Sequence, residues 1–193
     1  MTSSSPSKSR LRARLRERRR GLDLQTRAVA ALAVCEQIVK SPHWPGARRI
    51  ALYIANDSEM DTAPLAALCR DAGKRLYLPV MQADNTLCFA AWDAGTALLR
   101  NSYGIDEPPA SAERVAAADL DIIVLPLVGW DRQGTRLGMG GGYYDRSLAG
   151  VSGPVLAGLA YAMQESAGLP RDQWDVPLDI VVTEDGVHCC RSE

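Results

Sequence analysis

Short apolar runs alternate with longer amphipathic stretches along most of the chain. Six runs rich in aliphatic and aromatic residues predict strands, because such side chains fit a pleated, partly buried backbone. These runs are 49–55, 75–81, 87–92, 121–128, 155–161 and 179–183. A helical pattern precedes the first run and another separates the first two. Strand–helix–strand alternation is typical of an α/β layer with a mainly parallel sheet.

The predicted helices have recognisable ends. From Lys8 to Lys40 good helix formers dominate, and apolar residues recur every three or four positions. Residues 21–23 (Gly-Leu-Asp) interrupt this pattern and predict a break between two helices, and residues 41–46 end it. A further helix is predicted over 62–71, with Asp61 or Thr62 as its cap and Gly73 as its stop.

The run 121–128 (DIIVLPLV) is apolar on both faces, which indicates a central strand covered on both sides. The sequence contains no internal repeat and no segment with the composition of a linker between domains. The sequence therefore predicts a single α/β domain of three layers over residues 8–193, with a mainly parallel open sheet flanked by helices and a basic N-terminal helix. Residues 1–7, which are small and polar, are expected to form a disordered tail.

Composition excludes several classes of protein. The chain has 193 residues, 47% of them hydrophobic and 23% charged, close to the globular average, which excludes a collagenous, fibrous or wholly disordered protein. No apolar run approaches the roughly 20 residues that span a bilayer. The five cysteines are odd in number and form no C-x-x-C pair, and the N-terminus lacks the apolar stretch of a secretory signal. We expect a cytoplasmic monomer that makes no membrane contact.

Positive charge is concentrated at the N-terminus. Residues 1–20 hold Lys8 and seven arginines against Glu17 alone, a net charge of +7, whereas the whole chain carries −1. Such a segment requires an anionic ligand, nucleic acid or solvent around it. An organellar transit peptide would also be rich in Arg and Ser. Because the rest of the chain lacks basic patches interleaved with aromatic residues, nucleic acid would touch only this segment, and we do not expect it as a partner.

Four glycines fall within five positions shortly after the predicted central strand, in the segment 129–146. A loop of this kind can turn sharply and direct consecutive backbone N–H groups at an anion. Arg136 and Arg146 flank it and can neutralise phosphate oxygens, and Asp145 offers the hard oxygen that Mg²⁺ prefers. The strict Walker and dinucleotide-binding patterns are absent. A tight turn without a ligand remains the structural alternative.

The segment 136–146 (RLGMGGGYYDR) resembles the signature of the 5-formyltetrahydrofolate cyclo-ligase family, also called 5,10-methenyltetrahydrofolate synthetases. Further blocks of the chain match the family in the same order, so the resemblance covers nearly the whole sequence. These blocks are Lys8-x-x-Leu11-Arg12, 53–55 with 59–62, 73–79, 103–108 and 174–179.

The resemblance implies an enzyme that uses ATP and Mg²⁺ to convert 5-formyltetrahydrofolate, or a polyglutamylated form of it, into 5,10-methenyltetrahydrofolate, with release of ADP and phosphate. The formyl oxygen would be phosphorylated, and the N10 amine would then close the ring. Arg136 and Tyr144 are the implied catalytic residues, Asp145 and Asp175 the metal ligands, and Glu59, Tyr103 and Tyr143 the folate contacts. The implied nucleotide contacts are Lys8, Arg12, Arg136, Leu137, Gly138, Met139, Gly140, Gly141, Gly142, Tyr143 and Tyr144.

Each candidate also has a structural alternative. Lys8 and Arg12 would be solvated if the charged helix simply faces water. Glu59 and Asp61 could cap the helix that follows them, and Asp175 could stabilise a turn. Adjacent Tyr143 and Tyr144 are expected to point differently, one to the core and one to a ligand. His188 beside two cysteines lacks the further ligand pair of a zinc site.

Two functional alternatives stay open at this point. One is a nucleotide- or sugar-phosphate-binding α/β protein with an Arg-rich N-terminal helix that binds nucleic acid. The other is a sugar-phosphate isomerase or acyl-CoA transferase on a similar scaffold, since a fold does not fix a function.

Overall fold

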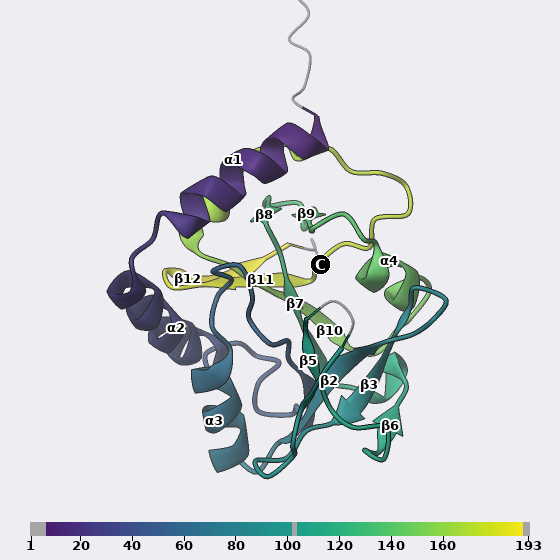
Figure 1. Ribbon diagram of the computed structural model, residues 1–193. Coiled ribbons are helices and arrows are strands. Elements are labelled where there is room, and N and C mark those ends of the chain that lie inside the picture. Colours follow the sequence, from purple (N-terminus) through teal and green to yellow (C-terminus); the bar gives the residue numbers. More distant parts are fainter. Residues whose placement is uncertain (1–6, 102–103, 191–193) are drawn as a thin grey trace, which may run out of the picture.

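The computed structural model describes residues 7–101 and 104–190, and its centre is one sheet of eight strands (Figure 1). The strand order is β12-β11-β10-β7-β1-β2-β3-β6. The central strands β11, β10, β7, β1 and β2 run parallel, and β12, β3 and β6 are antiparallel to their neighbours. The parallel strands are β1 (Arg49–Ala51), β2 (Arg75–Met81), β7 (Ile122–Pro126), β10 (Val155–Leu159) and β11 (Ile180–Thr183), and the antiparallel ones are β3 (Leu87–Ala91), β6 (Arg114–Val115) and β12 (Gly186–Cys189).

Helices cover both faces of this sheet and enclose two apolar cores. On one face α2 (Leu24–Ile38) and α3 (Ala63–Asp71) pack against alternate strand residues that include Ile122 and Val124 of β7. On the other face α4 (Tyr143–Leu148) packs against Ile123 and Leu125 of the same strand. The predicted central strand, buried on both sides, and the predicted mainly parallel α/β sheet are therefore confirmed.

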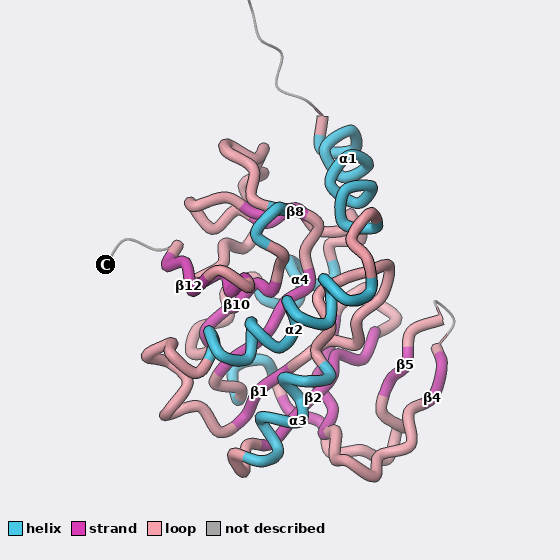
Figure 2. The backbone as a smooth tube through the Cα atoms, turned by 90° about the vertical axis from the view of Figure 1, so that its left-hand side faces the viewer, coloured by secondary structure: helices cyan, strands magenta, loops and turns pink. Residues whose placement is uncertain are grey.

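The N-terminal helix α1 (Lys8–Arg20) lies across the end of the molecule at which the parallel strands have their carboxyl ends (Figures 1 and 2). Leu11 and Leu15 attach it there, in a small core with Val128, Leu137 and Leu169. The predicted break after α1 is present, because Asp23 caps α2 by accepting a hydrogen bond of 2.7 Å from the backbone N–H of Thr26. Residues 1–6 of the predicted tail lie outside the described residues.

Several short elements have no counterpart among the predicted ones. They are the hairpins β4 (Leu99–Arg100) with β5 (Asp106–Glu107) and β8 (Gly129–Trp130) with β9 (Arg136–Leu137), and the 3₁₀ turns η1 (Ala117–Asp119) and η2 (Ala162–Gln164). A strand of two residues carries no periodicity from which it could be predicted.

Five of the six predicted strands are shorter than expected, and two of them by three residues or more. The run 49–55 leaves the sheet after Leu52, whose backbone N–H still donates to the Tyr77 carbonyl at 2.9 Å, and the run 121–128 ends at Pro126. In both cases apolar residues continue past the end of the strand. Tyr53 and Ile54, after β1, line a cavity, and Val128, after β7, packs beneath α1. The chain leaves β1 toward β2 on one side and returns to β7 on the other, so the carboxyl ends of β1 and β7 form the switch point at which α/β sheets bind ligands.

No helix in the described part of the chain is both long and apolar enough to span a membrane. His188 lies on β12, with its ring centre 4.9 Å from that of Trp130. Within the described ranges we find no group of three His, Cys, Asp or Glu residues that could bind a metal ion.

Candidate active site

A cavity of about 1070 Å³ opens at the switch point, beside the carboxyl ends of β1, β2 and β7. Its walls come from α1, the segment after β1, the glycine-rich loop, the β5 strand and the segment 171–177. The predicted site residues that line it are Lys8, Arg12, Glu59, Arg136, Leu137, Gly138, Met139, Gly140, Gly141, Gly142, Tyr143, Tyr144, Asp145 and Asp175. Tyr103, the other predicted folate contact, lies outside the described residues. Segments far apart in sequence thus meet around one space.

Two arginines hold the glycine-rich loop. The Arg12 Nε donates to the Gly138 carbonyl at 2.7 Å, and Arg146 donates to the Gly141 carbonyl at 2.7 Å. Gly140 and Gly142 have φ angles of +105° and +68°, which residues with a side chain rarely adopt. A Cβ atom on Gly142 would also lie 2.8 Å from the Arg146 Nη1. The left-handed backbone at these two positions therefore favours glycine, and the guanidinium group of Arg146 would have to shift to admit a side chain at Gly142.

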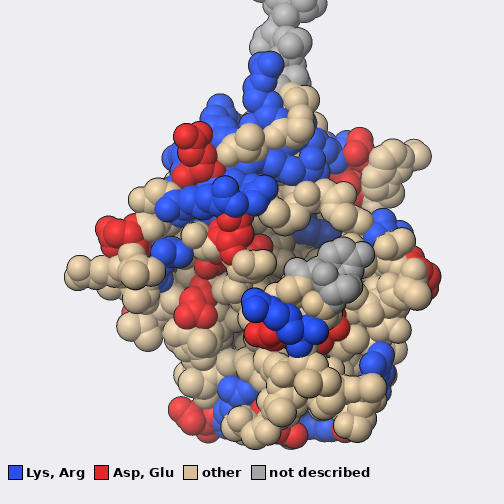
Figure 3. All heavy atoms as spheres, in the orientation of Figure 1, with Lys and Arg blue, Asp and Glu red and all other residues tan. Residues whose placement is uncertain are grey.

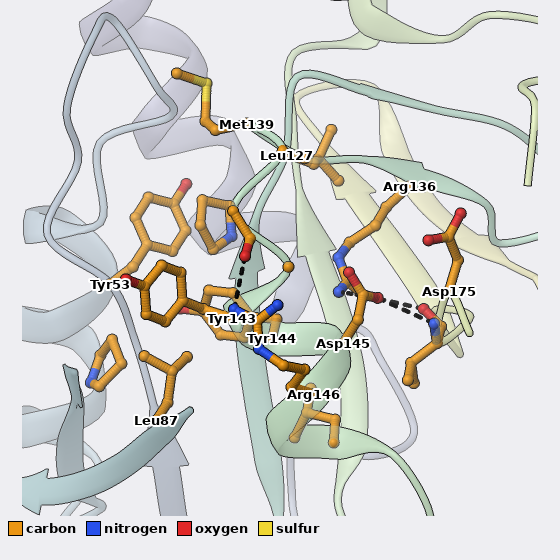
Figure 4. A pocket seen from close by; sticks show the side chains of 18 of the residues that line it. Tyr53, Leu87, Leu127, Arg136, Met139, Tyr143, Tyr144, Asp145, Arg146 and Asp175 are labelled. Carbon is orange, nitrogen blue, oxygen red and sulfur yellow. Dashed lines mark hydrogen bonds and ion pairs between the residues drawn. The ribbon is translucent and has the colours of Figure 1, made fainter. Parts of the chain in front are cut away.

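Arg136 and Asp145 form an ion pair at the wall of the cavity (Figure 4). Arg136 Nη2 lies 2.7 Å from Asp145 Oδ1, and Arg136 Nη1 donates to the Val176 carbonyl at 2.9 Å. The backbone N–H of Val176 donates to the same Asp145 oxygen at 3.0 Å. Burial lowers the pKa of Arg136, and the Asp145 carboxylate opposes that shift. The pair links the start of α4 to the segment 171–177.

A second ion pair joins the other predicted phosphate contact to the other predicted metal ligand. Lys8 Nζ lies 2.6 Å from Asp175 Oδ2 and 2.7 Å from Asp172 Oδ2. Burial would raise the pKa of Asp175, but the hydrogen bonds from Lys8 and from the Asp172 N–H, together with the charges of Lys8 and Arg136, lower the pKa overall. Lys8 and Arg12 thus face the site and are not simply solvated, and Asp175 bonds both to Lys8 and to the Asp172 N–H.

Glu59 faces the cavity from a tight turn after β1. Its Oε2 accepts from the Asn56 N–H at 3.0 Å, and its own N–H donates to the Asn56 carbonyl at 2.8 Å. Burial raises the pKa of Glu59, and the hydrogen bond from Asn56 opposes that shift. The N-cap residue of α3 is Thr62, whose side chain makes no capping hydrogen bond, and the preceding Asp61 accepts from the Ala63 N–H at 2.9 Å. Of the two carboxylates proposed as caps, only Asp61 bonds to the start of the helix.

Tyr143 and Tyr144 do not divide between core and cavity as expected. Both line the cavity, and Tyr144 also packs against the second core. The Tyr143 hydroxyl lies 3.3 Å from Asn85 Oδ1. Burial raises the pKa of Tyr144, and the nearby Glu59 adds to that effect, so the phenol is neutral at physiological pH. Because α4 begins at the rim of the cavity, two adjacent side chains of its first turn can both reach it.

The sequence model of the 5-formyltetrahydrofolate cyclo-ligase family matches residues 4–184. The chain belongs to this family. It is 40% identical over 142 residues to the cyclo-ligase of Haemophilus influenzae, a match that covers 70% of this chain and 76% of that one. Against the Escherichia coli K12 cyclo-ligase it is 35% identical over 173 residues, 86% of this chain and 94% of the relative.

A solved structure agrees with the sequence relatives. The NMR structure of the Aquifex aeolicus 5,10-methenyltetrahydrofolate synthetase superposes with a TM-score of 0.85 and 35% identity, and the match covers 96% of this chain and 94% of that one. The identification of the family from sequence is confirmed, and so is the α/β fold of the cyclo-ligase.

The cyclo-ligase site contains groups that the sequence analysis did not single out. Asp57 binds three arginines of α1: Arg16 at 2.8 Å, Arg19 at 3.1 Å and also Arg20. Figure 3 shows basic side chains gathered along α1 with acidic ones beneath them. Trp174 and Arg171 line the mouth of the cavity, where Trp174 is 65% exposed. Trp174 could have been found from the sequence, because it lies in the block 174–179 that matches the family. Asp57 lies in no matching block, so the sequence did not indicate it.

Proposed function

We propose that this cyclo-ligase couples ATP hydrolysis to the closure of 5-formyltetrahydrofolate into 5,10-methenyltetrahydrofolate, with release of ADP and phosphate. The observation that carries the proposal is the set of side chains that line the cavity at the switch point. One part of its lining holds cationic side chains around a glycine-rich loop, and another holds Glu59 with Tyr53, Tyr143 and Tyr144. Such a cavity can hold a nucleotide and a flat heterocycle together.

The reaction requires activation of a poor leaving group. The formyl oxygen attacks the γ-phosphorus of ATP, the bond to ADP breaks, and an imidate phosphate forms. The N10 amine then attacks the former formyl carbon, phosphate departs with the formyl oxygen, and N10 loses its proton. Phosphoryl transfer needs little covalent help from the protein, so positioning and charge neutralisation supply most of the catalysis.

The nucleotide phosphates are proposed to lie against the backbone of 138–142, with Arg136, Arg12 and Lys8 around them. Arg136 is 9% exposed and fixed by the Val176 carbonyl, so its guanidinium is oriented before a ligand arrives. A preorganised charge stabilises the transition state without reorganisation during the reaction. Arg136 therefore takes the catalytic role, and Tyr144 packs beneath it, with the guanidinium carbon 6.0 Å from the ring centre.

The donor set fits a magnesium ion that accompanies ATP. Mg²⁺ is usually held in such sites by one or two carboxylates together with substrate phosphates. Asp145 and Asp175 both line the cavity, and each already contacts a cation, Arg136 and Lys8 respectively. When bound, Mg²⁺ would supply neutralisation of phosphate charge. We propose that the two carboxylates would hold the ion, each beside a basic side chain, Arg136 or Lys8, that can neutralise phosphate oxygens.

Glu59 is proposed to bind the pterin. An ionised carboxylate only accepts hydrogen bonds, which suits the N–H groups of a pterin ring. Tyr143 lies near enough to the glycine-rich loop to contact both ligands, and Tyr103 retains a proposed folate contact by family resemblance alone.

The proposal predicts a specific optical signal. Purified protein mixed with 5-formyltetrahydrofolate and MgATP should produce the near-ultraviolet absorbance of the methenyl product, with one ADP formed for each product molecule. Omission of ATP should abolish the rise, and chelation of Mg²⁺ should reduce it strongly. An absorbance rise that does not depend on ATP, or no rise at all, would contradict the proposed function.

Lys8 provides a test of the nucleotide end. The variant Lys8→Met keeps the length of the side chain and removes its charge, so KM for ATP should rise by about tenfold or more, the lower range for a hydrogen bond to a charged group. The matched control is Arg14→Met, an exposed arginine of the same helix that does not line the cavity. Equal effects of the two variants on KM for ATP would show that Lys8 acts only as one of the surface charges and does not contact the phosphates.

A further inference from the structure

Arg19 is a wholly buried arginine on a helix whose neighbouring arginines, Arg18 and Arg20, are exposed. Its Nη1 donates to the Leu127 carbonyl at 3.1 Å, and its Nη2 donates to the Asp57 carbonyl at 2.9 Å. Leu127 directly follows β7, and Asp57 lies in the turn that follows β1. A single guanidinium therefore joins the segments that follow the two strands of the switch point.

The turn held by this guanidinium has an uncommon backbone. Asp57 and Ser58 have φ angles of +50° and +62°, a left-handed conformation that residues other than glycine rarely adopt. Such geometry persists when surrounding contacts determine it, and it is concentrated at functional sites. Here the Asp57 carboxylate is bound by Arg16, Arg19 and Arg20 together. The turn closes on itself through Asn56 and Glu59.

We propose that Arg19, acting through Asp57, is a positioning residue that holds the Glu59 carboxylate in its ligand-binding orientation. Arg19 Nη1 lies 4.0 Å from Glu59 Oε1, so the guanidinium fixes the turn and also faces the carboxylate that the turn presents. This inference rests on the proposed binding of the pterin by Glu59. It assigns the buried charge of α1 a part in folate recognition, separate from the nucleotide contacts made by Lys8 and Arg12 on the same helix.

The charges around Glu59 should make folate binding depend on pH. Arg19 and Arg16 face it from α1, Asp57 from its own turn, and Tyr53 and Tyr144 from the neighbouring walls. Burial raises the pKa of Glu59, while the Asn56 N–H and the Arg19 charge oppose that shift. Folate affinity should fall as the pH falls through this pKa, because the protonated acid is a poorer acceptor. Without the Arg19 charge the pKa rises further and the loss begins at a higher pH.

The competing interpretation is that Arg19 only anchors α1. An anchor would change the melting temperature, and its loss would weaken nucleotide and folate binding alike without moving a pH profile. A positioning residue affects folate binding selectively. It also acts through Glu59, so its effect should disappear once Glu59 has been replaced.

The test compares Arg19→Lys, Arg19→Met, Asp57→Asn and Arg18→Met as the exposed control. Folate affinity, KM for ATP and melting temperature are measured for each, with folate affinity followed over a range of pH. We expect Arg19→Lys and Asp57→Asn to weaken folate binding by about tenfold, the lower range for a charged hydrogen bond, with KM for ATP unchanged. In Arg19→Met, the pH below which folate affinity falls should in addition rise by about one pH unit, as expected when an opposite charge nearby is lost.

Several outcomes would overturn the positioning role. They are wild-type folate affinity in Arg19→Lys and Asp57→Asn, parallel losses for ATP and folate, or a further loss when Arg19→Lys is combined with Glu59→Gln. If Arg19→Met does not fold, folate affinity in Arg19→Lys and Asp57→Asn still tests the positioning role. Weakened folate binding in Glu59→Gln alongside unaffected Arg19→Lys would refute only the positioning role, whereas an inactive wild-type protein would refute the proposed function.

Discussion

Replacing Asp145 by asparagine is expected to lower kcat at saturating MgATP by about a hundredfold or more, the range observed when one preorganised electrostatic group is removed from a transition state. The substitution removes a carboxylate proposed to hold Mg²⁺ and the partner of the buried Arg136 guanidinium. Steady-state turnover across a series of Mg²⁺ concentrations measures the effect. Extra Mg²⁺ should recover only part of the loss, because Arg136 also loses the charge that orients it.

The contacts of Asp145 indicate that Asp145→Asn should also affect the stability of the protein. Asp145 Oδ1 accepts from both Arg136 and the Val176 N–H, so the change reaches into a partly buried network. An asparagine oxygen can still accept from both donors, and we expect a lowered melting temperature with the fold retained. Asp71→Asn, at the exposed end of α3, is the matched control and should retain full turnover. Normal turnover in Asp145→Asn at every Mg²⁺ concentration would show that the metal assignment is wrong.

Glu59→Gln is expected to weaken folate binding by about 1.5–3 kcal/mol, the range for hydrogen bonds to a charged group. The amide keeps the shape of the side chain and one acceptor oxygen, which can still accept from the Asn56 N–H, so the melting temperature should change little. Folate titration and thermal unfolding on the same preparation measure the two quantities.

Asp61→Asn is the matched control for Glu59, because the Asp61 carboxylate accepts a hydrogen bond at the start of α3 and does not line the cavity. It should lose about 0.5–1 kcal/mol of stability through the weakened charge at the helix start and bind folate normally. The two variants therefore have opposite signatures. Normal folate affinity in Glu59→Gln would remove Glu59 from the binding site.

The sheet could be predicted from sequence because its strands are apolar runs bounded by turn residues. β2, over 75–81, matches its predicted bounds, and β7 shows the burial on both faces that its sequence predicts. The predictions failed where an apolar residue serves the cavity, as Tyr53 does, since hydrophobicity alone does not separate a strand from a cavity wall. The hairpins β4–β5 and β8–β9 are too short to carry a pattern.

The candidate site was predictable to the extent that its residues are contiguous. The segment 136–145 lines the cavity nearly as a unit, as a glycine-rich loop after a strand predicts. The ion pairs were not predictable, because Lys8 and Asp175 are separated by 167 residues and Arg19 and Asp57 by 38. A partial signal existed in the spacing: Lys8, Arg12, Arg16 and Arg19 recur every three or four positions and thus share one helical face. Periodicity identifies such a face but not its partner.

The position of α1 at the top of the cavity has a consequence for biosynthesis. This helix is the first described element of the chain to be translated, yet Lys8 reaches Asp175, 167 residues later. At roughly 5–20 residues per second, translation of that interval takes on the order of ten seconds or more. During this time the helix lacks Asp57, then the glycine-rich loop, and last the segment 171–177, each appearing in turn from the ribosome. A nascent chain therefore cannot assemble the nucleotide end of the cavity until the segment 171–177 has left the ribosome.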